Sequence, residues 1–500
     1  MGITPMHEMR MEIDKRYVGF RPESGSVKPV HIASGAFRAI LGESDPSEGI
    51  KKLAYVMGVK GKAPKGNELE NVVQFLRDNN AYDETEITEK QLADFRGLLQ
   101  KLIDVDRGVY GSNGMWAFTA GADFFVTEAG QHEYAGEFIG GLIKVYCPLL
   151  GEYVDGILRM PVDPISIVFE PVHLHGEKKK LGEYRHETVE AFKNPNANVE
   201  FFLDGLKKAG ECLKSQLEKH PNKLTQLRLF VCFCVFQLIK YMSLLEAFYC
   251  KGNIRPVLFD FTYGKKSSVS QTSGLCYSQL HKSISRFYAW GFAQVIKNQF
   301  FHSKDELMKA DVLVYDKPKK DKDGNDIPMN AKTYDELKSM WDIAKADATD
   351  LPEDESLLIL GAAINGMTAA EATSNPVNYL RKLGTEIGLL YPPTNFHMDK
   401  RFLLSEDMLE ALLRCCVAPN ETVTSAKLRS RLFDRLGVVI GGDDKDSSRL
   451  NAIGSVVYAD TDALAENYEM FANALQKMNF AEQLPDGIMQ IRFGGERDAE

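Results

Sequence analysis

The 500-residue sequence lacks the short motifs that mark the commonest nucleotide-binding and hydrolytic sites. It contains no GxxxxGK followed by Ser or Thr, no GxGxxG after a predicted strand, no HExxH and no GxSxG. Each motif supplies groups that its chemistry needs, such as backbone N–H groups around phosphate, paired histidines on zinc or a nucleophilic serine. Their absence excludes the P-loop, dinucleotide-binding, zincin and α/β-hydrolase classes, and no cofactor is expected.

Cysteines with metal-site or redox spacing are also lacking. None of the eight cysteines forms a CxxC pair, and most have the apolar neighbours that are typical of small core side chains. The start of the sequence shows neither the basic stretch nor the apolar segment of a secretory signal. Unpaired thiols suit a reducing compartment, so a cytoplasmic location is expected.

Long uninterrupted apolar runs are absent as well. Leu224 to Cys250 is the most apolar stretch, but Arg228, Lys240 and Glu246 interrupt it. Its longest uncharged run, Leu229 to Ile239, is well short of the roughly 18 apolar residues that a membrane span needs. Apolar residues lie all round its helical projection, which predicts a helix buried in a large core and no membrane partner.

The chain has no excess of positive charge, because its net charge is -10 at pH 7. A nucleic-acid site would therefore need a local basic face on an acidic body. The composition is that of a globular chain, and its length predicts several domains. We expect a mainly α fold with small β elements (α+β), divided into a helical region 1–107, a central body 108–350, and C-terminal units 351–404 and 405–500.

Local patterns predict where the elements lie. The first thirty residues have no sustained period and are expected to form an extended lead-in. Thr88 and Gln91 have the spacing of a capping box, which predicts a helix start. Further helices are predicted at 45–57, 67–77, 133–146, 199–220 and 276–301, strands at 165–169, 257–261 and 313–315, and a charged hairpin tip at 317–326.

Residues 355–404 follow a helix-turn-helix order. A helix over 357–364, a turn at Gly366 and a short helix from Thr368 precede a third helix capped by Ser374 or Asn375. Two short strands, at 389–391 and 401–403, then flank a tip formed by two prolines. This segment, about a tenth of the chain, resembles the winged-helix family.

The resemblance implies that the third helix enters the DNA major groove while the wing reaches the backbone. Cations on both elements would then lie near phosphates, and asparagine or arginine could read base edges. Many winged helices serve only as protein-interaction modules, so both alternatives stay open. The residues that the resemblance assigns to nucleic-acid binding are Asn378, Arg381, Lys382, His397, Lys400 and Arg401.

A second winged-helix-like unit is predicted over 405–500. Helices at 406–417, 425–436 and 462–478 precede a Pro-Asp-Gly turn and a strand at 488–492. Its connecting loop and third helix are acidic, which would repel phosphate. We therefore expect this unit to contact protein. The acidic residues are Asp443, Asp444, Asp446, Glu466 and Glu469.

An enzymatic alternative starts from Glu170, His173 and His175, near the end of the predicted strand 165–169. Alternation along a strand places the two histidines on one face, where they could share a metal ion. No third ligand appears at useful spacing, so a metal site is not expected. Asp163, Glu177 and Lys179 loosely follow the residue order of a nuclease site, but Glu177 and Lys179 fall in a polar turn and not on a strand. The calcium-loop-like run from Asp321 lacks the turn glycine and the final glutamate.

The sequence as a whole favours binding over catalysis. We expect a non-catalytic, nucleic-acid- and protein-binding subunit of a multi-protein complex. Its partners would be other protein subunits and double-stranded DNA, in a setting such as prokaryotic DNA restriction or antiviral defence. The alternative is a metal-dependent nuclease or hydrolase that uses His173 and His175.

Overall fold

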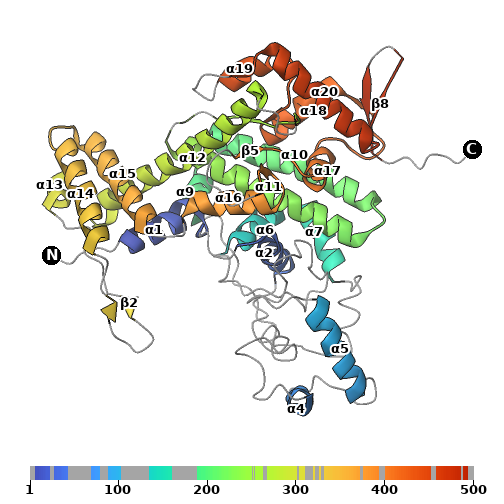
Figure 1. The fold of residues 1–500 in the computed structure, drawn as a ribbon, viewed down its shortest axis with the longest axis horizontal. Helices are drawn as coiled ribbons and strands as arrows, with labels where there is room; N and C mark the ends of the chain where they lie inside the picture. The colour runs from blue at the N-terminus through green and yellow to red at the C-terminus, as the bar shows by residue number, and fades with distance from the viewer. Residues whose placement is uncertain are drawn as a thin grey trace, which may run out of the picture.

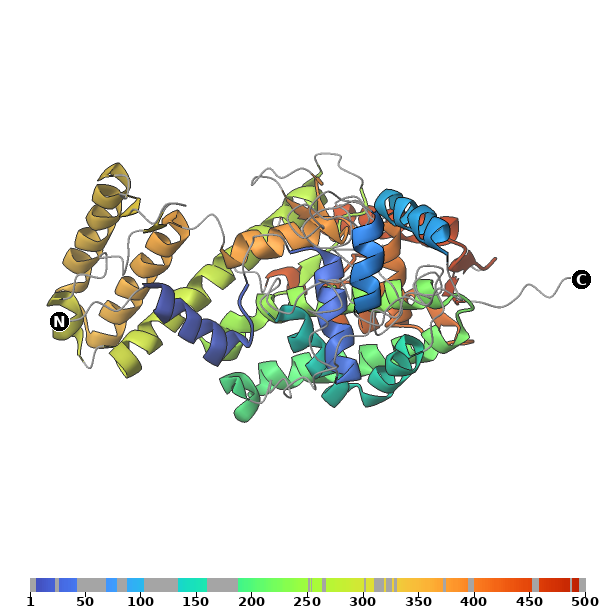
Figure 2. The same ribbon diagram turned by 90° about the horizontal axis from the view of Figure 1, so that it is seen from below.

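The structure of the chain is a computed structural model, and it is mainly helical with small strands, which confirms the expected fold class (Figures 1 and 2). Several sequence predictions fall outside the part of the chain that it describes, namely the helix at 45–57 and the strands at 165–169 and 313–315. The described residues are 6–22, 27–42, 69–78, 88–102, 134–159, 188–250, 252, 254–262, 267–300, 303–309, 319–320, 326–327, 331–371, 375–393, 400–451, 458–485 and 488–493.

The helix α11 (Lys223–Tyr249) confirms the predicted central helix. Its first turn is capped by Asn222, whose side chain accepts a hydrogen bond from the Thr225 backbone N–H at 3.1 Å. The helix packs against α12 and also against α2, α10 and α17. Its bulky side chains are buried on every side, so it lies at the centre of the core.

By length and hydropathy, one helix in the described residues could cross a membrane, and it is Thr225–Tyr249 of α11. Within its most apolar window, 89% of the residues are buried inside the protein. Its apolar surface is therefore covered by other parts of this chain.

The N-terminal residues correct one prediction. An extended lead-in was expected, but the chain forms α1 (Met6–Ile13) and the π-helical turn η1 (Asp14–Val18), followed by α2 (Pro29–Leu41). Met6, Met9, Ile13 and Tyr17 are buried at helical spacing. This apolar stripe is present in the sequence, but the charged residues between its members hide it, and packing against α12 gives it a partner.

The next helices agree with the sequence where they are described. The Thr88 and Gln91 capping box is confirmed, since each residue's side chain bonds the other's backbone N–H, at 2.9 and 3.3 Å. The predicted helices at 67–77, 133–146 and 199–220 are also confirmed. The helices described between residues 69 and 219 are α4 (Leu69–Asp78), α5 (Glu89–Leu102), α6 (Ala135–Tyr146), α7 (Pro148–Leu158), α9 (Glu190–Lys193) and α10 (Ala197–Lys219).

The long helix α12 (Ser268–Val295) runs from the centre to one end of the molecule, where α15 (Glu353–Glu371) packs against it and α14 (Ala331–Ala348) packs against α15 (Figures 1 and 2). The predicted turn at Gly366 is wrong, because α15 continues through it. A helical glycine costs about 1 kcal/mol relative to alanine, and buried side chains on both sides of Gly366 hold the helix against α12 and α14. In the sequence, α12 is followed by η5 (Ile296–Phe300), α13 (Lys304–Lys309), β2 (Lys319–Lys320) and β3 (Asp326–Ile327), and then by α14. The strands β2 and β3 pair in antiparallel fashion, which confirms the hairpin predicted around 317–326.

The helix α16 (Pro376–Glu386) begins as predicted, with the Asn375 side chain accepting from the Asn378 N–H at 2.8 Å. The strands β4 (Leu390–Tyr391) and β5 (Arg401–Phe402) form the predicted antiparallel hairpin. However, α16 packs chiefly against α11 and β4, whereas α15 packs chiefly against α12 and α14. The tandem winged-helix arrangement is therefore not confirmed.

The C-terminal unit contains a three-stranded sheet with the order β6-β9-β8, all antiparallel. Its strand β7 (Val438–Val439) instead pairs in parallel with β1 (Val257–Leu258), the short strand after the central helix. The remaining elements are α17 (Glu406–Arg414), β6 (Val423–Thr424), α18 (Ser425–Arg431), η6 (Leu432–Leu436), α19 (Asp446–Asn451), α20 (Thr461–Lys477), β8 (Ala481–Gln483) and β9 (Met489–Ile491).

Buried hydrophobic side chains from Met6 to Phe493 form a single cluster. The domain borders predicted at 107, 350 and 404 stay predictions, and this cluster includes residues on both sides of each border. Parallel pairing of β1 with β7 ties the C-terminal unit directly to the central helix region.

Candidate functional site

Three of the residues assigned to nucleic-acid binding lie on α16. Asn378, Arg381 and Lys382 are all half-buried, while Tyr379 and Leu383 on the same helix are fully buried. The helix therefore presents its polar side chains at the edge of the core. Their shared position on one helix agrees with the sequence prediction.

The two cations expected beside the wing point into the protein. Lys400 is 1% exposed, and its ammonium group donates to the Pro392 carbonyl oxygen across the hairpin. Burial lowers the pKa of Lys400, and the nearby Arg381 lowers it further. Arg401 is directed toward the buried carboxylate of Asp260, and His397 lies outside the described residues.

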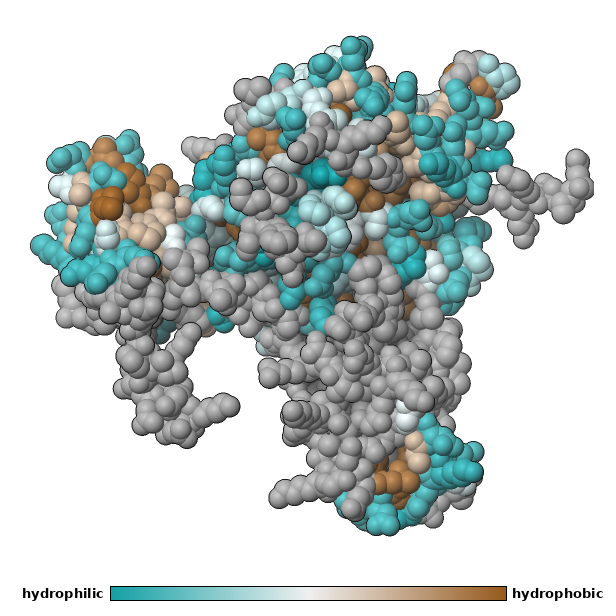
Figure 3. Space-filling view, in the orientation of Figure 1, coloured by the Kyte–Doolittle hydropathy of each residue, from teal (hydrophilic) through white to brown (hydrophobic). Residues whose placement is uncertain are grey.

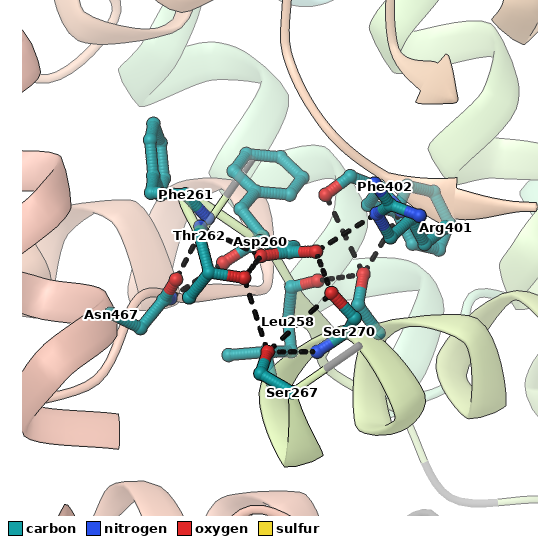
Figure 4. Close-up of polar contacts among 11 residues, drawn as sticks. Leu258, Asp260, Phe261, Thr262, Ser267, Ser270, Arg401, Phe402 and Asn467 are labelled. Carbon is teal, nitrogen blue, oxygen red and sulfur yellow. Dashed lines mark hydrogen bonds and ion pairs between the residues drawn. The ribbon is translucent and has the colours of Figure 1, made fainter. Parts of the chain in front are cut away.

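Asp260 is the centre of a buried polar cluster (Figure 4). Its Oδ1 accepts from the backbone N–H and the hydroxyl of Thr262, at 2.8 and 2.6 Å. Its Oδ2 accepts from the Ser270 hydroxyl at 2.6 Å and lies 2.9 Å from Nε of Arg401. Because Asp260 is 0% exposed, these contacts replace the water that its charge has lost.

Neighbouring side chains make further hydrogen bonds in the same region (Figure 4). The Ser273 hydroxyl donates to the Leu258 carbonyl at 2.8 Å and accepts from the Phe402 N–H at 2.9 Å. Asn467 on α20 accepts from the Phe261 N–H at 2.7 Å and donates to two backbone carbonyls. The cluster therefore joins β1, α12, the β4–β5 hairpin and α20. The hydroxyl and carboxylate groups of the cluster hydrogen-bond to one another and to the backbone. The cluster therefore stabilises the fold.

A different surface is exposed at the end of the molecule. Met340 and Ile343 on α14 and Leu358 on α15 are 37%, 59% and 45% exposed, and Figure 3 shows apolar residues gathered where these helices lie. We call these three side chains the α14–α15 face. The adjoining side of α14 carries the buried stripe that packs into the core, including Leu337 and Trp341.

Carboxylates surround this face. Eight of them, between residues 335 and 355, are exposed, whereas in the same stretch Lys338 is exposed and Lys345 is half-buried. Asp342 pairs with Lys345 at 3.6 Å and Asp354 pairs with Lys297 at 2.9 Å. Within the described part of the chain, the other six form no ion pair. These are Asp335, Glu336, Asp347, Asp350, Glu353 and Glu355.

The cysteines behave as core side chains. Six of the eight are buried and all are free. Burial raises the pKa of Cys232 and of Cys276 to about 12, which keeps these thiols protonated and unreactive. Among the described residues, no group of three His, Cys, Asp or Glu side chains could hold a metal ion. Glu170, His173 and His175 lie outside those residues, so the metal-dependent alternative rests on the sequence alone.

Comparisons with known proteins give no relative from which a role could be transferred. No protein-family model, no curated protein and no solved structure matches the chain. The function is therefore argued from the chain's own surfaces.

Sequence reasoning missed the α14–α15 face, although a signal was present. Leu337, Trp341, Ala344 and Ala348 form a complete helical stripe, which already accounts for the core contacts of α14. Met340 and Ile343 fall outside that stripe. Large apolar residues beside a complete core stripe indicate a second contact surface.

Proposed function

We propose that this chain is a non-catalytic subunit that binds a partner protein through the α14–α15 face. The observation that carries the proposal is three large apolar side chains, exposed together on two packed helices at one end of the molecule. Clustered exposed apolar side chains rimmed by polar residues are typical of protein contact sites. Burying them would release the water that now covers their surface.

The charge around the face specifies the partner's chemistry. Six exposed carboxylates without ion-pair partners favour a cationic partner and repel an acidic one. The partner that fits is an amphipathic helix with an apolar stripe and flanking Lys or Arg residues. Such a helix would place its apolar stripe over Ile343 and Leu358 and its cations over the rim.

The C-terminal unit supports a second protein contact. The proposed winged-helix resemblance is supported by α17, β6, α18, α20 and the β8–β9 hairpin, which follow one another in this order with β6 completing the sheet, while β7 and α19 are inserted before α20. Two of the unit's arginines are engaged internally, since Arg431 pairs with Glu421 at 2.7 Å and Arg449 with Asp446 at 2.8 Å. On α20 the acidic Glu466 and Glu469 are exposed. This unit therefore suits protein better than phosphate.

Duplex DNA binding is the second candidate function, and α16 supports it. Asn378, Arg381 and Lys382 lie on one helix at the protein surface, with one amide for base edges and two cations for phosphates. Lys400 and Arg401 add less, because they are directed inward. The setting we propose is a multi-protein complex acting on nucleic acid, as in DNA restriction or antiviral defence.

A peptide probe tests the protein contact. A labelled amphipathic helical peptide with a leucine stripe and lysine flanks should bind the full chain in fluorescence anisotropy, and added salt should weaken binding. The variant Ile343→Ser with Leu358→Ser should lose this binding. A peptide with the same stripe but glutamate flanks should bind much more weakly.

The matched control removes exposed apolar side chains elsewhere. Val145 and Leu149 are exposed on α6 and α7, and replacing both with serine should leave peptide binding unchanged. Equal binding by the parent and the Ile343 and Leu358 variant would exclude the α14–α15 face as the docking site.

A further inference from the structure

A cavity of about 300 Å³ opens where η1, α9, α10, α11 and α12 meet, away from the α14–α15 face. This size is at the lower end of the range for small-molecule pockets, so it suits a ligand with one or two rings. Its lining combines aromatic rings, amide side chains and a pair of opposite charges.

Three aromatic rings form one side of this cavity. Trp290 stacks on Tyr249 with ring centroids 5.1 Å apart and an interplanar angle of 20°. Tyr17 meets both rings edge-on, at 5.1 and 5.3 Å. The Tyr249 hydroxyl donates to the Tyr17 carbonyl and accepts from the Ala191 N–H, which fixes its ring in place. The aromatic wall is therefore already held in position.

Amide side chains continue this wall. Trp290, Gln294 and Asn298 follow one another at steps of four residues, so they lie along one side of α12 and its extension η5. Asn194, on the segment that links α9 to α10, also lines the cavity. Within the described part of the chain, the amides of Asn194, Gln294 and Asn298 make no hydrogen bond to protein. Each offers a donor and an acceptor to a ligand.

A charged pair completes the lining. The Arg16 Nε donates to Glu190 Oε1 at 3.2 Å, and Lys193 donates to the same oxygen at 3.0 Å. These contacts leave the second Glu190 oxygen and the terminal nitrogens of Arg16 without a protein hydrogen-bond partner among the described residues, and the guanidinium lies 5.3 Å from the centroid of the Tyr17 ring. The hydrogen bond from Lys193 is the main cause of the lowered pKa of Glu190, which keeps the carboxylate ionised.

We propose that this cavity binds an unpaired nucleobase. Asparagine and glutamine place a donor and an acceptor in one plane, which matches the neighbouring donor and acceptor on a base edge. Carboxylate and guanidinium groups complement the exocyclic amino groups and the carbonyl groups of bases. Aromatic rings supply the stacking surface that single-stranded nucleic-acid and nucleotide sites use. The base could come from a free nucleotide or from single-stranded nucleic acid.

Calorimetry on the full chain distinguishes these sources. The four ribonucleoside monophosphates form one arm, and single-stranded DNA decamers of each base form the other. At least one probe should bind in a saturable manner. Binding by mononucleotides assigns a free nucleotide, and binding by decamers alone assigns nucleic acid.

The double variant Gln294→Ala and Asn298→Ala should weaken that binding by about tenfold or more, because each bidentate base contact is worth about 1–3 kcal/mol. Both side chains reach the surface, so the fold should remain intact, and an unchanged melting temperature checks this. Gln271→Ala, which removes an exposed side chain in the first turn of α12, is the matched control and should bind as the parent does.

Three results would overturn the proposal. The first is that no nucleotide or decamer binds, and the second is that the double variant binds as tightly as the parent. The third is saturable binding of glucose or N-acetylglucosamine, lost in the double variant, which would reassign the cavity to carbohydrate. None of these results bears on the peptide binding of the α14–α15 face.

Discussion

Nε of Arg401 lies 2.9 Å from Oδ2 of Asp260, and this ion pair joins the β4–β5 hairpin to the segment that follows β1. The Arg401 side chain is largely buried and Asp260 is completely buried. The guanidinium also lies over the Tyr391 ring, 4.7 Å from its centroid. A cation that the sequence assigned to DNA phosphate is thus paired with a carboxylate inside the protein.

We predict that Arg401→Ala destabilises the fold by about 3 kcal/mol. Removing one member of a buried pair leaves the other charge uncompensated, which typically costs about 3–5 kcal/mol. The three hydrogen bonds from Thr262 and Ser270 remain on Asp260, which places the loss at the lower end of that range. Urea denaturation monitored by circular dichroism measures the change in the free energy of unfolding.

Arg492→Ala is the control for Arg401→Ala. Arg492 lies 4.0 Å from Glu482, and both side chains are exposed. Exposed pairs contribute at most about 1 kcal/mol, so this variant should unfold close to the parent. Similar small losses for both arginines would show that the Arg401 pair does not stabilise the hairpin.

The two glycines of α15 should respond oppositely to alanine. A Cβ added at Gly361 would overlap the Ala289 carbonyl oxygen of α12, so the two backbones would have to separate. A Cβ added at Gly366 meets only the flexible end of Met340, at 3.1 Å. We expect Gly361→Ala to destabilise by about 1–3 kcal/mol, and Gly366→Ala to be neutral or stabilising by up to about 1 kcal/mol.

Thermal unfolding of both glycine variants tests this contrast. A large loss for Gly366→Ala would indicate that α15 needs a break there, as the sequence pattern suggested. A neutral Gly361→Ala would show that α12 and α15 are not in close backbone contact.

The sequence predicted those elements whose signals are local. The all-round apolarity of α11, the Asn375 cap of α16 and the capping box at Thr88 each depend on residues within one or two turns. Gly366 gave a misleading local signal, because the contacts that keep α15 continuous come from α12 and α14. Such tertiary contacts outweigh a weak intrinsic preference.

Pairings between distant segments could not be predicted. The strands β1 and β7 are two residues long and pair Val257 with Val438, so neither has an alternating pattern that would specify a partner. The residues around Arg401 in the sequence do not indicate whether its guanidinium contacts a DNA phosphate or the Asp260 carboxylate. Only the fold brings these two residues together, which is why the predicted DNA-binding set mixed inward and surface cations.

Lys240 should make stability depend on pH. This lysine of the central helix is buried, and its ammonium group donates to the Arg435 carbonyl at 2.7 Å. Burial lowers its pKa to about 7. In the unfolded chain the pKa is near 10.4, so between these values the unfolded state binds more protons than the folded state. Stability therefore rises with pH across this window, and the cost of burying the charge is largest below it.

Comparison with Lys240→Met isolates this contribution, because methionine fills similar space without a charge. The difference in unfolding free energy, parent minus variant, should increase between pH 7 and pH 10 with a slope of up to about 1.4 kcal/mol per pH unit. Urea denaturation at several pH values measures it. Parallel curves for the two proteins would show that Lys240 stays charged in the folded state.

Duplex binding, if α16 performs it, should depend on Arg381 and Lys382 and not on Lys400. Each phosphate contact releases condensed counterions and contributes about 0.9 to the slope of log affinity against log salt. Replacing both α16 cations with alanine should therefore weaken binding at low salt and make the slope shallower by up to about two units. Lys400→Met should keep the parent slope, because its ammonium group is already bound to the Pro392 carbonyl.

The decisive measurement is fluorescence anisotropy with a labelled duplex over a salt series. Asp443→Ala with Asp444→Ala in the acidic loop of the C-terminal unit serves as a second control, and it should leave binding unchanged or slightly stronger by removing repulsion. Affinity should be modest, since the chain carries a net charge of -10. If the parent binds no duplex even at low salt, or if the α16 variant gives the same slope, α16 is not a DNA-binding helix. The chain's contacts would then be with protein, through the α14–α15 face and the C-terminal unit.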